Sequence, residues 1–428
     1  MKILIIAYYF PPSTGAAPLR PYYWAKYWSE AGHDVTILTK NNAGTLSLPE
    51  LPGVEIISLT HFDIYTFFRK KNRTRNDNQT SEITQKNPSL LKRILYFLQK
   101  HTGILSSVRM PEPADFWYFP ARRWLNKTPK QWDLIVSTCG PYVTHLIAHY
   151  AIAHKKASLW NADYRDMWTQ HSFFRGLFPF TLLEKVLEKY ILKKCTSLST
   201  VDPYLVQILE NKYTIKTFLA YNGYDPLPLT CTKRRNSITI AYIGTFYRKI
   251  QNIELLCAAL QLLKRDNSQL FHNLSIVFAG TNDIHHITTL FTVYEIASCL
   301  TVTRPVPHDE AIALQHTSDA LLFVDYWDVR KNRPVPLISQ KLIEYCFSNT
   351  EILIIGSPIK TYRADIIIES GCGAFFQTAD ELFLHIKNIC LHGKNNISPR
   401  FDYLNKFTRK QSSTQLLSDI LAHSHQTL

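Results

Sequence analysis

The sequence predicts an α/β protein of two Rossmann-like domains, each built on a parallel sheet. Its 428 residues are enough for two or three domains of ordinary size. Short apolar runs alternate with segments of helical periodicity, which is typical of β–α–β units. The runs are continuous rather than alternating, as expected for parallel strands buried on both faces. A turn-rich linker near residue 230 divides this alternation into two series.

The first series begins with an apolar run at residues 2–7, followed by a loop rich in proline and glycine at residues 11–18. Apolar and aromatic residues then recur at helical intervals between Leu19 and Tyr27. This order predicts a strand, a loop and a helix. Further strands of the series are expected at residues 34–39, 54–59, 133–137, 158–162 and 197–201.

The second series follows a linker at residues 222–236, which combines a turn sequence, two prolines and a basic polar stretch. Its strands are expected at residues 237–244, 274–280, 320–324 and 351–356. The sequence therefore predicts an N-terminal domain over residues 1–230, a C-terminal domain over residues 231–406 and a last helix within residues 407–428.

Two kinds of basic segment interrupt the first half. Residues 69–88 are polar and basic without an apolar period, which predicts a mobile insertion. Residues 89–100 and 181–194 predict amphipathic helices whose lysines and arginines lie away from an apolar face of leucine, isoleucine, valine and tyrosine. Each helix is either an ordinary surface helix packed on a core or a contact with an anionic membrane, and the sequence leaves both open.

The composition excludes a disordered chain, because 46% of the residues are hydrophobic and 23 Phe, 23 Tyr and 8 Trp are present. The net charge of +14 favours an anionic partner, such as nucleic acid, a membrane surface or a phosphorylated substrate. No apolar run is long enough to span a bilayer, and the start becomes polar too soon for a signal peptide, so a cytoplasmic location is expected. The eight cysteines have no zinc-like spacing and are expected to be reduced and mostly buried.

The loop at residues 11–18 follows the first strand, at the edge of the sheet where open α/β folds bind ligands. Gly15 allows the backbone to approach a ligand closely. The loop contains neither the GxGxxG pattern of dinucleotide-binding proteins nor the GxxxxGK[ST] pattern of P-loop proteins. These two classes of nucleotide-binding enzyme are therefore disfavoured.

Seven segments, which follow one another in the family's order, resemble GT-B glycosyltransferases of the large retaining family 4. They are residues 8–39, 110–121, 133–148, 161–169, 221–225, 241–249 and 339–346. The resemblance covers nearly the whole chain. It implies that the N-terminal domain binds the acceptor, that the C-terminal domain binds a nucleotide-sugar donor, and that the last helix packs back towards the first domain.

The resemblance assigns donor contacts to residues of both halves. Gly15 in the first loop is one of them, and Gly244 and Thr245 end a strand where backbone N–H groups can approach a diphosphate. Arg248 and Lys249 are the catalytic cations, which neutralise charge on the leaving phosphate. The alternative for these two is an ordinary solvated pair at a helix start.

The segment at residues 339–346 resembles the nucleotide-binding motif of the family. Glu344 is expected to bind the ribose hydroxyls, while Ser339 and Lys341 serve the phosphates. A structural role is the alternative for Lys341. The family often has a second glutamate eight positions before the ribose-binding one, but Pro336 stands there in this chain, which breaks the pattern.

In the first half, three charged residues follow the strand at residues 158–162. Asp163 and Asp166 are predicted to position or deprotonate an acceptor hydroxyl, with Arg165 beside them on the acceptor side. Trp168 and Trp117 are also assigned to the acceptor side by resemblance. The alternative for the charged residues is an internal salt bridge that fixes the loop.

The sequence thus predicts a retaining glycosyltransferase that moves a sugar from a nucleotide-diphosphate donor to a lipid-linked or polysaccharide acceptor in cell-surface glycan synthesis. We expect it at the inner face of the cell membrane as a peripheral protein on anionic lipid, with no cofactor, no metal and no nucleic acid as partner. Three alternatives stay open, namely a GT-B sugar-nucleotide epimerase, an inactive relative of these transferases and a basic nucleic-acid-binding protein.

Overall fold

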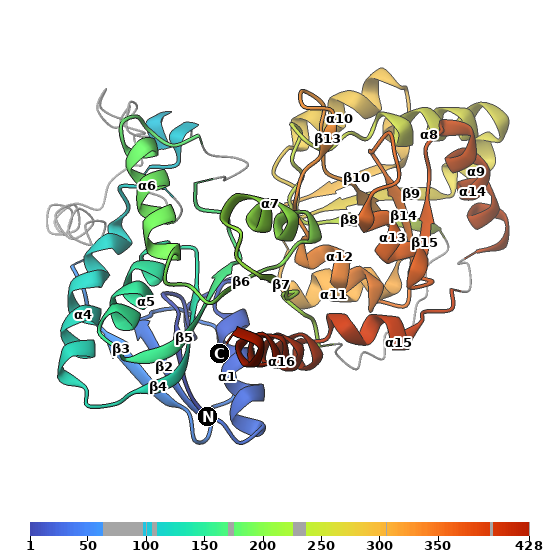
Figure 1. Ribbon diagram of the computed structural model, residues 1–428. Coiled ribbons are helices and arrows are strands. Elements are labelled where there is room, and N and C mark those ends of the chain that lie inside the picture. Colours follow the sequence, from blue (N-terminus) through green and yellow to red (C-terminus); the bar gives the residue numbers. More distant parts are fainter. Residues whose placement is uncertain are drawn as a thin grey trace, which may run out of the picture. The chain divides into compact units, whose positions relative to one another are not determined.

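The structure is a computed structural model that describes residues 1–62, 97–99, 101–104, 109–169, 175–225, 237–304, 306–393 and 397–427 (Figure 1). The insertion expected at residues 69–88 and nearly all of the helix expected at residues 89–100 lie outside the described residues. The chain forms two compact units. The N-terminal unit comprises Met1–Tyr221 and Ser412–Leu428, and the C-terminal unit comprises Asn222–Gln411.

The N-terminal unit is built on a seven-stranded parallel sheet in the order β3-β2-β1-β4-β5-β6-β7. Its strands are β1 (Lys2–Ile6), β2 (Asp34–Lys40), β3 (Glu55–Leu59), β4 (Trp132–Thr138), β5 (Ala157–Tyr164), β6 (Ser197–Thr200) and β7 (Thr217–Leu219). Its helices include α1 (Leu19–Glu30), α4 (Tyr118–Lys127), α5 (Val143–Ala153), α6 (Phe180–Leu192) and α7 (Pro203–Tyr213), with a 3-10 turn at Pro113–Trp117.

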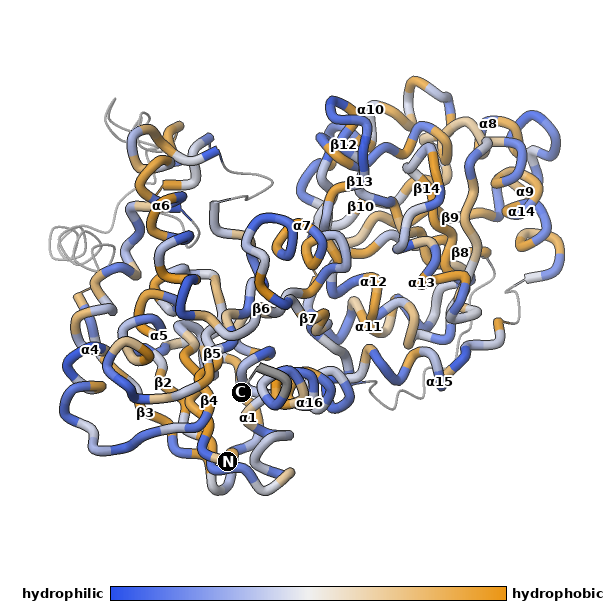
Figure 2. Tube along the Cα trace, in the orientation of Figure 1, coloured by the Kyte–Doolittle hydropathy of each residue, from blue (hydrophilic) through white to orange (hydrophobic). Residues whose placement is uncertain are grey.

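Strand β1 shows why this sheet is parallel and central. Leu4 and Ile6 belong to the core on one face of the sheet, whereas Ile3 and Ile5 belong to the core on the other face. All four side chains are fully buried. A strand buried on both faces needs a continuous apolar sequence, and the strands of both sheets accordingly appear as hydrophobic segments in Figure 2.

The last helix, α16 (Arg409–Thr427), contributes to the N-terminal unit from Ser412 onward. Leu416, Leu417 and Ile420 are buried in the core that contains α1. The indole nitrogen of Trp28 in α1 donates a hydrogen bond of 2.8 Å to the carbonyl oxygen of Ser413. The end of the chain is therefore part of the N-terminal hydrophobic core.

The C-terminal unit has a six-stranded parallel sheet in the order β10-β9-β8-β11-β14-β15. Its strands are β8 (Ile238–Ile243), β9 (Leu274–Ala279), β10 (Leu300–Thr303), β11 (Ala320–Val324), β14 (Glu351–Ile355) and β15 (Gly373–Phe375). Its helices are α8 (Glu254–Asp266), α9 (Ser268–His272), α10 (Ile284–Val293), α11 (His308–Thr317), α12 (Gln340–Cys346), α13 (Tyr362–Glu369), α14 (Ala379–His392) and α15 (Phe401–Leu404). Strands β12 (Trp327–Asp328) and β13 (Arg333–Pro334) form a separate antiparallel hairpin. The predicted fold class, two parallel-sheet α/β domains, is confirmed.

In α6, unlike in an ordinary amphipathic helix, the glutamates are buried and most of the predicted apolar face is exposed. Its buried side chains include Glu184 and Glu188, each fully buried. Glu184 forms an ion pair of 3.1 Å with Arg109, and Glu188 forms one of 2.9 Å with Lys212. The apolar face predicted from the sequence is mostly exposed, with Leu183 53% and Val186 68% accessible. Leu187 of that face packs against the hydrophobic core, whereas Leu183, Val186 and Tyr190 are exposed.

The cysteines agree with the expectation of reduced, mostly buried side chains. All seven that the structure describes are free, and five of these are buried. Within the described residues, no helix combines the length and the apolar character that membrane crossing requires.

Candidate functional site

The loop after β8 is closed by hydrogen bonds from buried side chains. Gly244 has a φ of +107°, which a residue with a side chain rarely adopts. The Tyr242 hydroxyl donates to the carbonyl oxygen of Thr245 over 2.7 Å. The Gln251 amide donates to the carbonyl oxygen of Val324 in β11 over 2.6 Å and accepts from the Tyr242 hydroxyl over 3.2 Å. The loop thus has a fixed path at the carboxyl edge of the sheet.

Lys341, in the first turn of α12, reaches the same point. Its Nζ lies 3.8 Å from the centre of the Tyr242 ring and is buried without a hydrogen-bond acceptor among the described residues. A Cβ atom on Gly244 would lie 3.2 Å from Lys341 Cε, so glycine is what lets the ammonium approach the loop. Burial lowers the pKa of Lys341 to about 7, while the charge of Glu344 acts in the opposite direction. The structure therefore brings together two predicted donor residues, Gly244 and Lys341, around an ammonium without a hydrogen-bond acceptor among the described residues.

Glu344 lies on the same helix as Lys341, and Ser339 is the residue that precedes the helix. The Glu344 carboxylate accepts a long hydrogen bond of 3.5 Å from the Gln315 amide of α11. Burial raises the pKa of the Glu344 carboxyl, against the opposing effect of His308. The predicted ribose and phosphate residues of this segment are thus carried by one short helix at the edge of the sheet.

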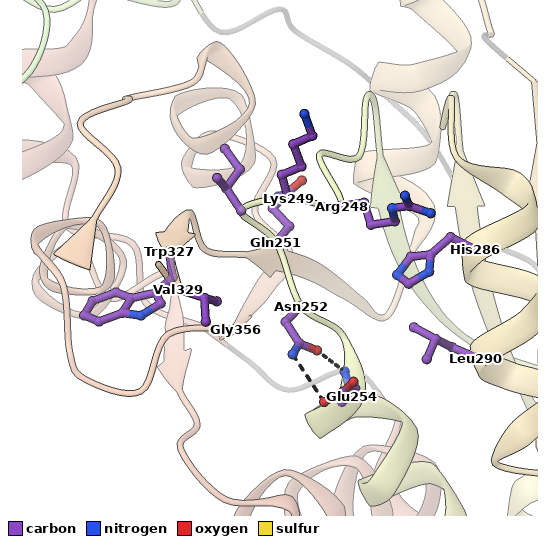
Figure 3. Close-up of a pocket in the computed structure, with 11 residues that line it drawn as sticks. Arg248, Lys249, Gln251, Asn252, Glu254, His286, Leu290, Trp327, Val329 and Gly356 are labelled. Atoms are coloured by element: carbon purple, nitrogen blue, oxygen red, sulfur yellow. Dashed lines mark hydrogen bonds between the residues drawn. The ribbon is translucent and has the colours of Figure 1, made fainter. Parts of the chain in front are cut away.

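Arg248 and Lys249 are exposed and lie further along the loop than Gly244. Arg248 is 62% exposed, and its Nε lies 3.9 Å from the Asp283 carboxylate. Both cations line a cavity of about 170 Å³ that neither Gly244 nor Lys341 lines. His286 of α10 and the hairpin residues Trp327 and Val329 contribute to this cavity (Figure 3). The sequence does not single them out, because the hairpin is too short to show a period and His286 lies in an ordinary helix.

The segment that contains Pro336 is held by a buried ion pair that the sequence analysis missed. Arg363 of α13 and Asp325, which follows β11, are both fully buried and paired. Arg363 also donates to the carbonyl oxygens of Tyr326 and Val335, each over 2.9 Å. A guanidinium with several donors in a fixed fork can hold a loop in this way. The path of the chain between β11 and α12 thus depends on this arginine.

Asp163 at the end of β5 makes the contacts of an internal ion pair. Arg20 donates to its two carboxylate oxygens over 2.7 and 3.0 Å, and Thr138 and Ser199 each donate over 2.8 Å. Asp163 is fully buried, and Arg20 is 3% exposed. Both oxygens are therefore engaged by the protein. This arrangement corresponds to the salt-bridge alternative rather than to a residue that handles an acceptor proton.

Arg165 joins three loops at the carboxyl edge of the N-terminal sheet. Its guanidinium donates to the carbonyl oxygen of Ala17 over 3.1 Å and to that of Gly140 over 2.9 Å, and it pairs with Asp166 over 3.2 Å. Gly15, in the same loop as Ala17, is exposed and has a φ of +98°. The Asp166 side chain is 46% exposed. Of the predicted acidic pair, Asp166 is therefore the one that remains open to a ligand.

The two tryptophans predicted on the acceptor side are core residues. Trp117 and Trp168 are both fully buried. Trp168 stacks on Tyr142 with a ring separation of 4.4 Å, and Trp117 packs edge-on against Tyr8 at 5.5 Å. Neither ring offers a face to a ligand in this structure. The sequence could not distinguish them from ligand-binding aromatic residues, because both roles favour large aromatic side chains.

No clusters of three or more His, Cys, Asp or Glu side chains suited to a metal ion occur among the described residues. In the C-terminal unit, the Lys341 ammonium is buried without an acceptor among the described residues, and Arg248 and Lys249 line the cavity.

No protein-family profile matches the sequence, and no curated protein matches it. Solved structures do match over the whole chain. Sucrose-phosphate synthase from Thermosynechococcus elongatus is 14% identical with a TM-score of 0.54, covering 98% of this chain and 99% of its own. A trehalose-6-phosphate protein from E. coli, bound with UDP-2-fluoro glucose, is 11% identical with a TM-score of 0.58, covering 98% and 99%. The chain has the GT-B fold. The pneumococcal O-GlcNAc transferase GtfA, in complex with UDP and GlcNAc, is a further match at 8% identity with a TM-score of 0.54, covering 99% of each chain.

Proposed function

We propose that this protein is a retaining glycosyltransferase of family 4 that transfers a sugar from a nucleotide-diphosphate donor. The observation that carries the proposal is the Lys341 ammonium, buried against Gly244 and Tyr242 without a hydrogen-bond acceptor among the described residues. A buried cation without an acceptor is costly unless an anion binds beside it. The diphosphate of a nucleotide sugar supplies that anion, and two of the structural matches are bound to UDP or a UDP-sugar.

In this proposal the protein works by positioning and by stabilising the leaving group. Glu344 binds the ribose hydroxyls and Lys341 the diphosphate, while Arg248 and Lys249 neutralise the negative charge that grows as the sugar leaves. The acceptor attacks on the face from which the diphosphate departs, so the anomeric configuration is retained and no covalent protein nucleophile is needed. Asp166 is the acidic residue that remains for orienting the acceptor, with Arg165 fixing its loop. The cations supply the charge that a metal would otherwise provide.

We further propose that the acceptor is lipid-linked or a growing cell-surface saccharide, and that the protein binds the inner face of the cell membrane through α6. Both acidic residues of this helix are fully buried, so its exposed surface combines apolar side chains with lysines. The exposed apolar residues are Phe178, Leu182, Leu183, Val186 and Tyr190, and the exposed lysines are Lys185, Lys189, Lys193 and Lys194. Such a combination suits an anionic lipid surface, where each cation contributes roughly 1 kcal/mol.

Donor binding is tested by thermal denaturation with UDP, GDP, ADP, CMP and TDP, because a ligand of the native state raises its stability. We expect one nucleotide to raise the Tm of the wild type and to have no effect on Glu344→Ala. The matched control is Glu310→Ala, which removes an exposed glutamate of α11. Absence of a shift with every nucleotide would refute the donor assignment and favour a catalytically inactive protein or a nucleic-acid-binding one.

Membrane binding is tested by sedimentation with lipid vesicles at low salt. The vesicles contain about 30% phosphatidylserine, a fraction on the order of that in anionic leaflets. We expect the wild type to sediment and the double variant Leu183→Glu/Val186→Glu to remain in solution. Both positions are more than half exposed, so the substitutions leave the fold intact. Val293→Glu, at a 70% exposed site on α10, is the control. Equal sedimentation of both proteins contradicts the role of α6.

A further inference from the structure

The hairpin β12–β13 projects from the C-terminal unit directly after the carboxyl end of β11. Trp327 pairs with Pro334, and Asp328 pairs with Arg333. The Asp328 carboxylate accepts hydrogen bonds from the backbone N–H groups of Arg330 and Lys331, over 3.1 and 3.3 Å. This side chain closes the turn, as aspartate commonly does. The hairpin therefore has a defined shape, and its only carboxylate is used to form it.

The base of the hairpin is fixed on two sides. The buried pair of Asp325 and Arg363 holds the chain immediately before it and after it. The backbone N–H of Trp327 donates to the carbonyl oxygen of Ile250 over 2.7 Å. Ile250 follows Arg248 and Lys249 in sequence, so the hairpin is tied to the loop that carries these two cations.

Between the hairpin and that loop lies the cavity of about 170 Å³. Figure 3 shows Trp327 and Val329 on one side of it and Arg248 and His286 on the other. Its volume is below the roughly 300 Å³ at which pockets begin to enclose a whole small molecule. It equals the volume of about six water molecules in the liquid. The cavity therefore suits one ring-sized part of a larger ligand.

Positive charge is concentrated on the loop and the hairpin that border this cavity. From residue 329 to residue 339 the chain has three basic residues and no acidic one. Arg248 and Lys249 line the cavity, and all five basic residues of the loop and the hairpin are exposed. The other three, Arg330, Lys331 and Arg333, follow Val329, which lines the cavity. The nearby carboxylates are Glu254, Asp283 and Asp328. Cations therefore outnumber carboxylates here even after the Arg248–Asp283 and Lys331–Asp328 contacts, at 3.9 and 3.8 Å, are taken into account.

We infer that the hairpin and the cavity bind a carboxylate on the transferred sugar, so that the donor is a nucleotide-diphosphate uronic acid. The inference rests on the proposed function. The Trp327 and Val329 side chains contact the apolar part of the sugar ring, and the hairpin cations bind its carboxylate. Arginine is suited to this because its planar donors match the two oxygens of a carboxylate. Lys341 and Gly244 bind the diphosphate separately, since neither lines the cavity.

The test compares donors that differ at one carbon. Isothermal titration measures the affinity of the full chain for UDP, UDP-glucose and UDP-glucuronic acid, or for GDP, GDP-mannose and GDP-mannuronic acid if guanine is the preferred base. We expect the uronic acid to bind about tenfold more tightly than the neutral sugar. In the triple variant Arg330→Gln/Lys331→Gln/Arg333→Gln this preference should fall to about one, with the affinity for the free diphosphate unchanged. Arg265→Gln is the control, because Arg265 is exposed at the opposite end of α8 from the cavity.

The outcomes separate this inference from the proposed function. Binding of a diphosphate with equal affinity for the neutral and the acidic sugar overturns the inference and leaves the proposed function standing. A preference for the acid that persists in the triple variant also overturns it, because the hairpin would then not be the site. If no nucleoside diphosphate binds at all, the proposed function fails and the inference fails with it.

Discussion

Replacing Lys341 with methionine should stabilise the protein while abolishing donor binding. Burial lowers the pKa of Lys341 from 10.5 to about 7. At ~1.4 kcal/mol for each pKa unit, burial of the ammonium costs the fold on the order of 5 kcal/mol. The attraction of Glu344 is already contained in this pKa, and the contact with the Tyr242 ring recovers part of the cost. Methionine has a similar length and no charge, so we expect Lys341→Met to raise the free energy of unfolding by about 1 to 3 kcal/mol at pH 7.

The sign of the pH dependence follows from the same pKa. The native pKa is lower than the unfolded one, so the unfolded state binds more protons between about pH 7 and pH 10.5. The stability of the wild type should therefore rise with pH across this range, and its deficit relative to Lys341→Met should narrow. Below pH 7 the ammonium is charged in both states, and the deficit is fully present.

Urea denaturation followed by circular dichroism at pH 6.5 and pH 9.5 measures both effects. The control is Lys360→Met, which removes a 51% exposed lysine that pairs with Asp365 and should change stability by less than about 1 kcal/mol. Nucleotide binding to each variant is measured in parallel. A Lys341→Met variant that is less stable than the wild type at both pH values would show that the ammonium is compensated within the protein, and the reasoning would be refuted.

Three further predictions concern the N-terminal unit and the metal requirement. Asp163→Asn should lower the free energy of unfolding by about 3 to 5 kcal/mol, because Arg20 stays buried without its counter-charge, and a loss below about 1 kcal/mol in a urea titration would contradict this. Gly140→Ala should destabilise by about 1 to 3 kcal/mol in thermal denaturation, since its φ is +93° and a Cβ would lie 2.6 Å from Arg165 Nη2. Gly32→Ala is the control, because Gly32 has a similar φ of +84° but no atom lies within 4 Å of the added Cβ. An equal loss of stability in Gly32→Ala would assign the whole effect of Gly140→Ala to the backbone conformation. Sugar transfer should persist within about twofold after dialysis against EDTA, because cationic side chains supply the charge, and activity that returns only with Mg²⁺ would contradict the proposal.

The fold could be predicted because the strands carry a strong local signal. A run such as residues 3–6 has no polar residue, and only a sheet covered on both faces buries all four side chains. The contact between Gly244 and Lys341 was also predictable in part, since both residues lie in motifs with a fixed order along the chain. Their contact in the structure is the outcome expected when two strand-end segments meet at one edge of a sheet.

The remaining features depend on partners distant in sequence, which a local pattern does not specify. The apolar face of α6 was visible in the sequence, but its exposure follows from Arg109 and Lys212 binding the two glutamates. The sequence could not decide between an acceptor-side role and an internal salt bridge for Asp163, because its ion-pair partner, Arg20, lies 143 residues earlier in the chain. The same holds for Asp325 and Arg363, which are 38 residues apart and shape the segment around Pro336.

In α6, one set of side chains attaches the helix to the protein and a different set forms its outer face. Its buried carboxylates connect the helix to the protein, while its outward residues make few contacts with the described core. Substitutions on the outer face are therefore free of the penalty that core changes carry. Successive single changes can therefore alter the chemistry of this outer face without passing through unfolded intermediates.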